Sequence, residues 1–445
     1  MNHISIKRLV HGISGRGSHA LRAKTAIVRR WLPGRRARQC ALVRLAHCLV
    51  SSRGEASGIA IATRLLNLYD LASPHTREQF LRELAENFGP DREQLAKAWG
   101  RFATSGWSAY PALCLAVEAP RQELFRRLNL TPGGTHRLVR MRQDLSAMAD
   151  RHSASLVDAD LLHLLRSWFN RGFLSFSPIT WSSPADLLER VIRHEAVHNI
   201  HSWDALRDRL LPADRRCYGF FHQSMPGEPL IFVEVALTRG TPGSIAPLLA
   251  SDRDVLDAGA ADTAVFYSIS NCQDGLRGIS FGNFLIKQVA EDLRRELPGL
   301  RTFVTLSPIP GFMAWLKREH GALAARIEPL IDNPAIESHR DKLLQACATY
   351  LAYARDGHNR PLDPVARFHL GNGASIERLN WAADGSAKGL RQSAGMMVNY
   401  RYELGRVEDR HDAHAQDGTI SMSTAFRRVF GRRWPGSTAG DQHAR

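Results

Sequence analysis

The sequence contains no run of about 18 apolar residues, so nothing in it resembles a membrane-spanning helix. It also lacks a C-x-x-C pair and a secretory signal with an apolar core and a small-residue cleavage site. Cysteine is scarce, and the six cysteines are widely spaced, at positions 40, 48, 114, 217, 272 and 347. These absences argue against a membrane protein and a disulfide-rich secreted scaffold, and they favour a reducing cytoplasm.

Acidic residues are missing from the first 54 positions, which hold twelve Lys or Arg. These twelve account for most of the net charge of +15, so the rest of the chain carries only +3. A basic segment of this kind is compatible with a mitochondrial transit peptide, a nucleic-acid-binding arm or a solvated extension. We favour the solvated extension and expect no nucleic-acid partner, because the remainder of the chain is nearly balanced in charge.

A chain of 445 residues is too long for one ordinary core, because domains commonly contain about 100 to 200 residues. We expect an α+β protein, with an N-terminal all-α helical bundle followed by a mixed α/β domain. The predicted segments are a partly disordered basic arm, the helical domain, the α/β domain and a disordered tail, over residues 1–54, 55–170, 171–432 and 433–445.

The pattern of apolar residues changes along the chain. It has helical spacing over 57–173, for example at 76–84 and 160–169, whereas 173–181 is rich in β-forming residues and precedes a predicted helix over 183–198. Two β-rich runs joined across Pro226-Gly227-Glu228 predict a hairpin, and a strand, a helix and another strand follow. The five ranges are 217–222, 230–238, 263–270, 283–297 and 301–306.

A glycine-containing loop stands between the predicted strand 263–270 and the helix that follows it. Its candidate binding residues are Arg277, Gly278, Ile279, Ser280, Phe281, Gly282 and Asn283. Glycine lets backbone N–H groups approach a phosphate, and the helix dipole favours an anion, although about half of such turns are merely structural. The spacing Arg-Gly-x-x-x-Gly resembles the pyrophosphate loop of the GNAT acetyltransferase superfamily, which grips coenzyme A. Ser280 departs from that pattern, in which glycine is usual.

Two further segments hold side chains suited to oxyanion and proton-transfer chemistry. Pro308 biases Ser307 to an extended conformation, so the serine hydroxyl is held on a stiff loop where the strand 301–306 ends. His369 lies on a short β-like run, 363–373, before a Gly-Asn-Gly turn, and histidine titrates in a useful range. Taken singly, a Ser-Pro turn without catalytic role and a packed or surface histidine are the commoner outcomes.

Taken together, these segments resemble the malonyl-CoA decarboxylase family over roughly residues 165–405. The matching blocks are Pro226-Gly-Glu-Pro229, Phe266-Tyr-Ser-Ile-Ser270, Gly282-x-Phe-Leu-Ile-Lys287, Leu306-Ser-Pro-Ile-Pro-Gly-Phe312, Phe368-His-Leu370, Asn380-Trp381 and Asn399-Tyr-Arg-Tyr402. The resemblance implies a helical domain used in homo-oligomer contacts and a GNAT-like catalytic domain that needs no metal and no redox cofactor. It also implies that coenzyme A is part of the substrate, malonyl-CoA.

The resemblance assigns the catalytic serine to Ser307, the catalytic histidine to His369 and the coenzyme A loop to residues 277–283. Loss of CO2 from malonyl-CoA leaves an enolate, so the enzyme must bind an oxyanion and then protonate carbon. We expect Ser307 to bind the thioester oxygen and His369 to deliver the proton. Formation of a malonyl ester on Ser307 is an open alternative, and Tyr400 and Arg401 are weak candidates for binding the malonyl carboxylate.

Three competing hypotheses remain at this point. The segment from His194 to His198 matches the H-E-x-x-H pattern of zinc proteases, but it lacks the usual third-ligand continuation, so we expect no metal site. The other two are a non-catalytic acyl-CoA-binding or regulatory protein and an acetyltransferase that acts on an amine. Both would keep the same fold.

Overall fold

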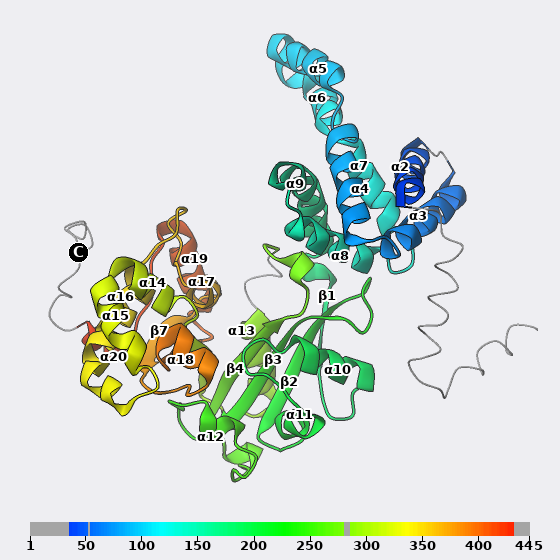
Figure 1. The fold of residues 1–445 in the computed structure, drawn as a ribbon. Coiled ribbons are helices and arrows are strands. Elements are labelled where there is room, and N and C mark those ends of the chain that lie inside the picture. The colour runs from blue at the N-terminus through cyan, green and yellow to red at the C-terminus, as the bar shows by residue number, and fades with distance from the viewer. Residues whose placement is uncertain (1–34, 52–53, 280–284, 431–445) are drawn as a thin grey trace, which may run out of the picture. The chain divides into compact units, whose positions relative to one another are not determined.

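The structure is a computed structural model that describes residues 35–51, 54–279 and 285–430. By its internal contacts the chain divides into two compact units, Met1–Leu165 and Arg166–Arg445 (Figure 1). The first unit is entirely helical over its described residues, and the second contains a mixed sheet flanked by helices. The predicted α+β fold class is therefore confirmed.

Helices of the first unit begin at good capping residues. The Ser73 side chain accepts the N–H of Thr76 ahead of Pro74, and Asp91 accepts the N–H groups of Glu93 and Gln94. The helices are α2 Arg35–Ser51, α3 Glu55–Asp70, α4 Pro74–Asn87, α5 Arg92–Ser105, α6 Tyr110–Val117, α7 Pro120–Asn129, α8 Gly134–Ala147 and α9 Arg151–Trp168, with the 3-10 turn η1 Gly106–Ala109.

Part of the basic N-terminal segment is helical. Helix α2 packs against α3, α4 and α7. It buries Leu42, Ala46 and Leu49, which lie on one face of the helix because they are spaced four and then three residues apart. The described part of the predicted arm thus contributes apolar side chains to the core of this unit.

The second unit is built on an eight-stranded sheet with the order β1-β2-β3-β4-β5-β8-β6, in which β7 pairs with β8. The predicted hairpin is present as the antiparallel pair β2 and β3. The strands are β1 Leu174–Pro178, β2 Arg215–His222, β3 Pro229–Thr238, β4 Thr263–Asn271, β5 Thr302–Thr305, β6 Ser307–Pro308, β7 Ser375–Asn380 and β8 Met397–Arg401.

Strands β4 and β5 form the parallel pair of the sheet, and they separate before β4 ends. Their register runs from Thr263 with Thr302 to Phe266 with Thr305, and the N–H of Leu306 donates to the carbonyl of Phe266. Beyond this point β4 continues to Asn271 along β3, after a bulge at Tyr267. The opening between the two strands therefore begins next to Ser307.

Helices pack on the sheet through apolar stripes. Helix α13 buries Leu285, Ile286, Val289, Ala290 and Leu293, which recur at helical spacing. The helices are α10 Ala185–His194, α11 Trp203–Leu210, α12 Ala246–Leu249, α13 Leu285–Glu296, α14 Phe312–Glu319, α15 Gly321–Ile327, α16 Arg340–Tyr353, α17 Pro364–Gly371, α18 Ala387–Ser393, α19 Val407–Asp417 and α20 Thr424–Val429. Short 3-10 turns are η2 Arg171–Phe173, η3 Ala258–Ala260, η4 Asp274–Leu276, η5 Glu328–Leu330 and η6 Pro334–His339.

Two sequence-based predictions of local structure are wrong. The run 363–373 is the helix α17 rather than a strand, because the Asp363 carboxylate accepts the N–H groups of Val365 and Ala366 and Pro364 suits the first helical position. The predicted helix 183–198 ends at His194, because Glu195 accepts the N–H groups of Val197 and His198 and so holds them in a turn. Capping outweighed the local propensity in both places.

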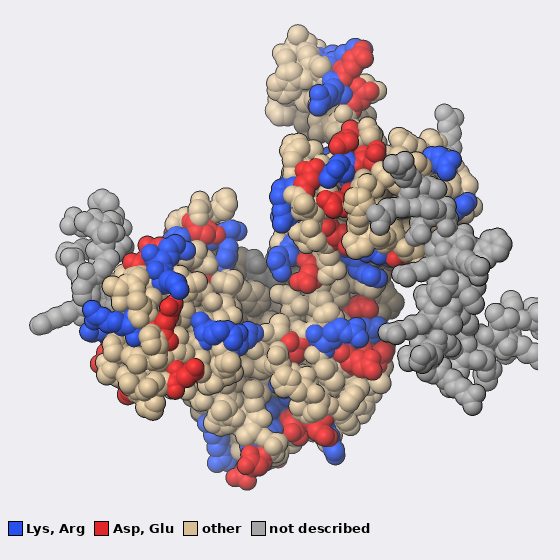
Figure 2. Space-filling model, in the orientation of Figure 1, with Lys and Arg blue, Asp and Glu red and all other residues tan. Residues whose placement is uncertain are grey.

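Surface charge on the described residues is mixed. On the face shown in Figure 2, Lys and Arg side chains alternate with Asp and Glu, and they form no continuous basic surface there. No helix within the described ranges is long and apolar enough to cross a membrane.

Candidate active site

Ser307 lies at the point where β4 and β5 separate. It belongs to β6, where it pairs with Val398 of β8, and its side chain is 4% exposed. The Ser307 hydroxyl donates to Thr305 Oγ1 at 2.8 Å, and the same Thr305 oxygen accepts the N–H of Tyr400 at 3.0 Å. The sheet therefore holds the serine hydroxyl through a neighbouring hydroxyl that is itself fixed by the β8 backbone.

His369 comes from α17 and reaches the same place from a position 62 residues later in the chain. Its Nε2 lies 3.1 Å from Ser307 Oγ, and its Nδ1 lies 2.8 Å from the Tyr402 hydroxyl. The Tyr400 ring stacks on the imidazole, with 4.6 Å between centroids and 25° between planes. Burial lowers the pKa of His369 from its ordinary 6.5 to about 3, so the imidazole is neutral at physiological pH.

The hydrogen bonds around His369 favour one tautomer. Ser307 uses its hydrogen on Thr305, so its oxygen is able to accept from a protonated Nε2. The fully buried Tyr402 has a raised pKa because of burial and keeps its proton, which it donates to an unprotonated Nδ1. In the opposite tautomer, the Tyr402 hydrogen would find no acceptor among the described residues and would be buried unpaired. We therefore assign the proton of the neutral imidazole to Nε2, facing Ser307.

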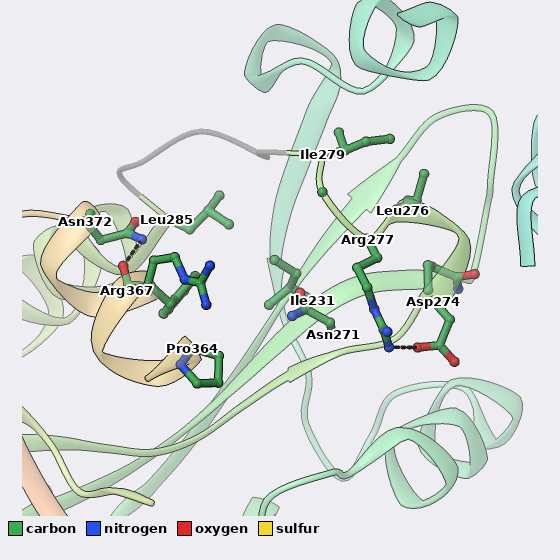
Figure 3. A pocket seen from close by; sticks show the side chains of 14 residues that line it. Ile231, Asn271, Asp274, Leu276, Arg277, Ile279, Leu285, Pro364, Arg367 and Asn372 are labelled. Atoms are coloured by element: carbon green, nitrogen blue, oxygen red, sulfur yellow. Dashed lines mark hydrogen bonds and ion pairs between the residues drawn. The ribbon is translucent and has the colours of Figure 1, made fainter. Parts of the chain in front are cut away.

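A cavity of about 510 Å³ lies next to the helix that carries this histidine (Figure 3). Arg277, Gly278 and Ile279, three of the residues predicted to bind coenzyme A, line it together with Leu285 at the beginning of α13. The other four predicted residues, Ser280, Phe281, Gly282 and Asn283, lie outside the described residues. Gly278 has φ of +81°, a conformation that favours glycine.

Helix α17 forms another side of the same cavity. Pro364, Arg367, Phe368 and Asn372 line it, and His369 is the next residue after Phe368. Figure 3 shows Arg367 and Arg277 on opposite sides of the cavity, with Arg277 paired to Asp274 at 3.3 Å. Arg367 pairs with Asp356, outside the view, at 3.1 Å. The helix that carries His369 thus connects the cavity to the buried Ser307–His369 pair.

The structure also contains contributors that the sequence reasoning missed. Thr305, Tyr402 and Arg367 were not singled out, although Tyr402 ends the block Asn399-Tyr-Arg-Tyr402 that carries part of the resemblance. Tyr400, a weak candidate for binding the malonyl carboxylate, is fully buried against His369, and Arg401 pairs with Glu377 at 3.8 Å. The available signal was the alternation of side chains through β8 and the residue directly after it, because Tyr400 and Tyr402 are two residues apart.

The H-E-x-x-H pattern does not form a metal site in the described part of the chain. His194 ends α10 while His198 follows in the turn, so the two histidines do not share a helix face. Glu195 is buried and accepts hydrogen bonds from the hydroxyls of Ser268 and Ser270. Over residues 35–51, 54–279 and 285–430, no group of three His, Cys, Asp or Glu residues is arranged to hold a metal ion.

A helical N-terminal unit is followed by a mixed α/β unit in which one helix carries the histidine of a buried serine–histidine pair and also lines a cavity. These features define an α+β protein with a candidate active site. Family comparison gives a more specific result. The family model for the malonyl-CoA decarboxylase C-terminal domain matches residues 172–439, and that for the malonyl-CoA decarboxylase N-terminal domain matches residues 88–169. The chain belongs to the malonyl-CoA decarboxylase family and is an enzyme of that family, as the sequence blocks indicated.

Solved structures and curated relatives agree with this assignment. The structure of malonyl-CoA decarboxylase from Rhodopseudomonas palustris is 50% identical, covers 88% of this chain and 99% of its own, and superposes with a TM-score of 0.84. That from Agrobacterium vitis is 49% identical, with coverage of 88% and 100% and a TM-score of 0.83. The Mus musculus protein "Malonyl-CoA decarboxylase, mitochondrial" is 36% identical over 386 residues, which are 75% of this chain and 77% of the mouse protein.

Proposed function

We propose that this chain decarboxylates malonyl-CoA to acetyl-CoA and CO2, with Ser307 binding the thioester oxygen and His369 protonating the α-carbon. The observation that carries the proposal is the 3.1 Å contact between Ser307 Oγ and His369 Nε2 in a chain of this family. Both side chains are buried, so water is largely excluded and hydrogen bonds to a developing charge are strengthened.

The proposed reaction moves one electron pair and one proton. The bond between the α-carbon and the carboxylate breaks, CO2 leaves, and the electron pair delocalises onto the thioester oxygen as an enolate. The Ser307 hydrogen rotates from Thr305 to that oxygen, as an oxyanion donor. His369 then gives its Nε2 proton to the α-carbon, and solvent later returns a proton to Nε2. No metal ion or redox cofactor is needed, because side chains handle both the oxyanion and the proton.

We propose that the 510 Å³ cavity receives the coenzyme A portion of the substrate. Its position at the loop 274–279 and the beginning of α13 suits a pyrophosphate, since backbone N–H groups and the helix dipole there favour anions. Arg277 and Arg367 add positive charge on two sides. Binding of this remote portion holds the malonyl group near Ser307 and His369, where orientation lowers the barrier.

Purified protein and carboxyl-labelled malonyl-CoA test the proposed reaction directly. Release of the label as CO2, with acetyl-CoA as the other product and no added amine, is the expected result. Binding without turnover would instead support the non-catalytic acyl-CoA-binding protein. Product that forms only when an amine is added would support the acetyltransferase.

Substitution of Gly278 with alanine should weaken substrate binding more than catalysis. A non-glycine residue at φ of +81° costs about 1–2 kcal/mol, so we expect KM for malonyl-CoA to rise about 5- to 30-fold with kcat within about twofold. Steady-state kinetics measure both. Gly321→Ala is the matched control, because that glycine begins the helix α15 without a positive φ and a Cβ there meets no atom within 4 Å. An unchanged KM in Gly278→Ala would remove this loop from the proposed binding site.

The assembly and the compartment stay predictions. We propose that the helical unit makes the homo-oligomer contacts, because α5, η1 and α6 expose large apolar side chains that a monomer usually buries. These include Trp99, Trp107, Tyr110 and Leu115, of which Trp107 is 79% exposed. We also propose a cytoplasmic location, on the cysteine content alone.

A further inference from the structure

We infer that Asp363 is a positioning residue that fixes the distance between Ser307 and His369 by tying the loop after Ser307 to the helix that carries His369. The inference rests on the proposed function for the meaning of that distance, but the geometry stands without it. Asp363 does not touch the reacting groups. It acts through the backbone on either side of them.

The two carboxylate oxygens of Asp363 serve different parts of the fold. Oδ1 accepts the N–H groups of Val365 and Ala366, both at 2.9 Å, and so caps the first turn of α17. Oδ2 accepts the N–H of Gly311 at 3.4 Å and the hydroxyl of Tyr350 at 3.3 Å. One carboxylate therefore joins α17, the loop 308–311 and α16. At 1% exposure it is shielded from competing water.

The loop side of this link leaves little room for adjustment. A Cβ added at Gly311 would lie 2.1 Å from the Tyr350 hydroxyl oxygen and 3.6 Å from Asp363 Oδ2. Gly311 follows Ser307 by four residues, of which Pro308 and Pro310 are conformationally restricted. His369 lies six residues into the helix that Asp363 caps. A shift at Asp363 is thus transmitted to both members of the pair through short, stiff segments.

An aspartate that only caps a helix uses one carboxylate oxygen for the cap and does not need the other oxygen to bind a distant segment. The second oxygen of Asp363 therefore distinguishes a positioning residue from an ordinary cap. Asp91 caps α5 through Oδ1 with the same two kinds of bond, to Glu93 N–H at 2.9 Å and Gln94 N–H at 3.0 Å. Among the described residues, its Oδ2 accepts a hydrogen bond only from the Gln94 side-chain amide, at 3.4 Å. Asp363 directs Oδ2 instead at a loop 52 residues earlier in the chain.

The test uses Asp363→Asn and Asp363→Ser in the full chain. Both residues keep an N-cap acceptor for α17, but neither accepts the Gly311 N–H as Oδ2 does, since the asparagine amide nitrogen only donates and serine is too short. We expect kcat for malonyl-CoA to fall about 10- to 100-fold with KM within about twofold, because displacements on the order of 1 Å in a catalytic pair have effects of this size.

Tyr350→Phe keeps the ring and removes the hydroxyl that donates to Asp363 Oδ2. It should also lower kcat, by a smaller factor. Asp91→Asn and Asp91→Ser should leave kcat unchanged.

A crystal structure of Asp363→Asn provides a readout that does not depend on turnover. We expect the separation between Ser307 Oγ and His369 Nε2 to exceed hydrogen-bonding distance in the variant and to stay near 3.1 Å in Asp91→Asn. An unchanged separation in Asp363→Asn overturns the inference, whatever the rate. If Asp363→Asn and Asp363→Ser fail to fold, an unchanged kcat in Tyr350→Phe overturns it. Absence of decarboxylation by the unsubstituted protein would overturn the proposed reaction instead, and the separation would still decide the role of Asp363.

Discussion

Replacing Ser307 with alanine is expected to lower kcat for malonyl-CoA decarboxylation by about two to three orders of magnitude, with coenzyme A affinity unchanged. The hydroxyl is the group that donates to the enolate oxygen in the proposed reaction, and loss of one oxyanion donor has this cost in a water-excluded site. Affinity is retained because the cavity proposed for coenzyme A is formed by the loop 274–279, Leu285 and α17 rather than by Ser307.

Release of labelled CO2 measures the rate of this variant, and titration calorimetry with coenzyme A measures its affinity. Ser175→Ala is a suitable control, because that serine is exposed on β1 and takes no part in the site. Near-normal turnover in Ser307→Ala would eliminate the oxyanion role. Loss of coenzyme A binding would make Ser307 a binding residue instead.

The same variant addresses the covalent alternative. His369 Nε2 is close enough to Ser307 Oγ to act as a base, at 3.1 Å, but the tautomer assigned here places a proton on that nitrogen. We therefore expect no malonyl ester on Ser307 when the protein is quenched during turnover and examined by mass spectrometry. A malonyl adduct on the peptide containing Ser307, absent in Ser307→Ala, would show that Ser307 is a nucleophile.

Replacing His369 with alanine is expected to lower kcat by about 10² to 10⁴, the range for a general acid or base, while coenzyme A affinity is retained. His369→Gln is the sharper variant, because the glutamine amide keeps a donor and an acceptor but cannot transfer a proton. If His369→Gln turned over at nearly the normal rate, hydrogen bonding alone would be sufficient and proton transfer by His369 would be ruled out.

The pH dependence provides a further check on His369. Because burial lowers its pKa to about 3, the neutral form persists as pH falls through 6.5, and protonation begins only in strongly acidic solution. His369 should therefore cause no inflection near pH 6.5 in the profile of kcat/KM, which reports the free enzyme. The profile in this range should have the same shape in His369→Gln. An inflection there that the substitution abolishes would mean that His369 titrates at its ordinary pKa.

Local sequence patterns were sufficient for much of the second unit and misleading in one critical place. The hairpin β2–β3, the strand β4 and the helix α13 follow from β-rich runs and helical spacing, which short-range interactions determine. The segment around His369 was predicted to be a short β-like run. The Asp363 cap and Pro364 made it a helix, in which Phe368 lines the cavity and His369 lies within hydrogen-bonding distance of Ser307.

The sequence by itself determined the fold class and the family, because both depend on residue types and spacings within short segments, and the resemblance to that family made Ser307 and His369 the catalytic candidates. Only the tertiary structure decided how these residues act together. Strand β8 pairs with both β5 and β6, and this places Tyr400 and Tyr402 against a histidine from α17 and the Thr305–Ser307 hydroxyls. These contacts join residues 33 to 95 positions apart. No local pattern encodes them, because they arise from the order of strands in the sheet and from burial.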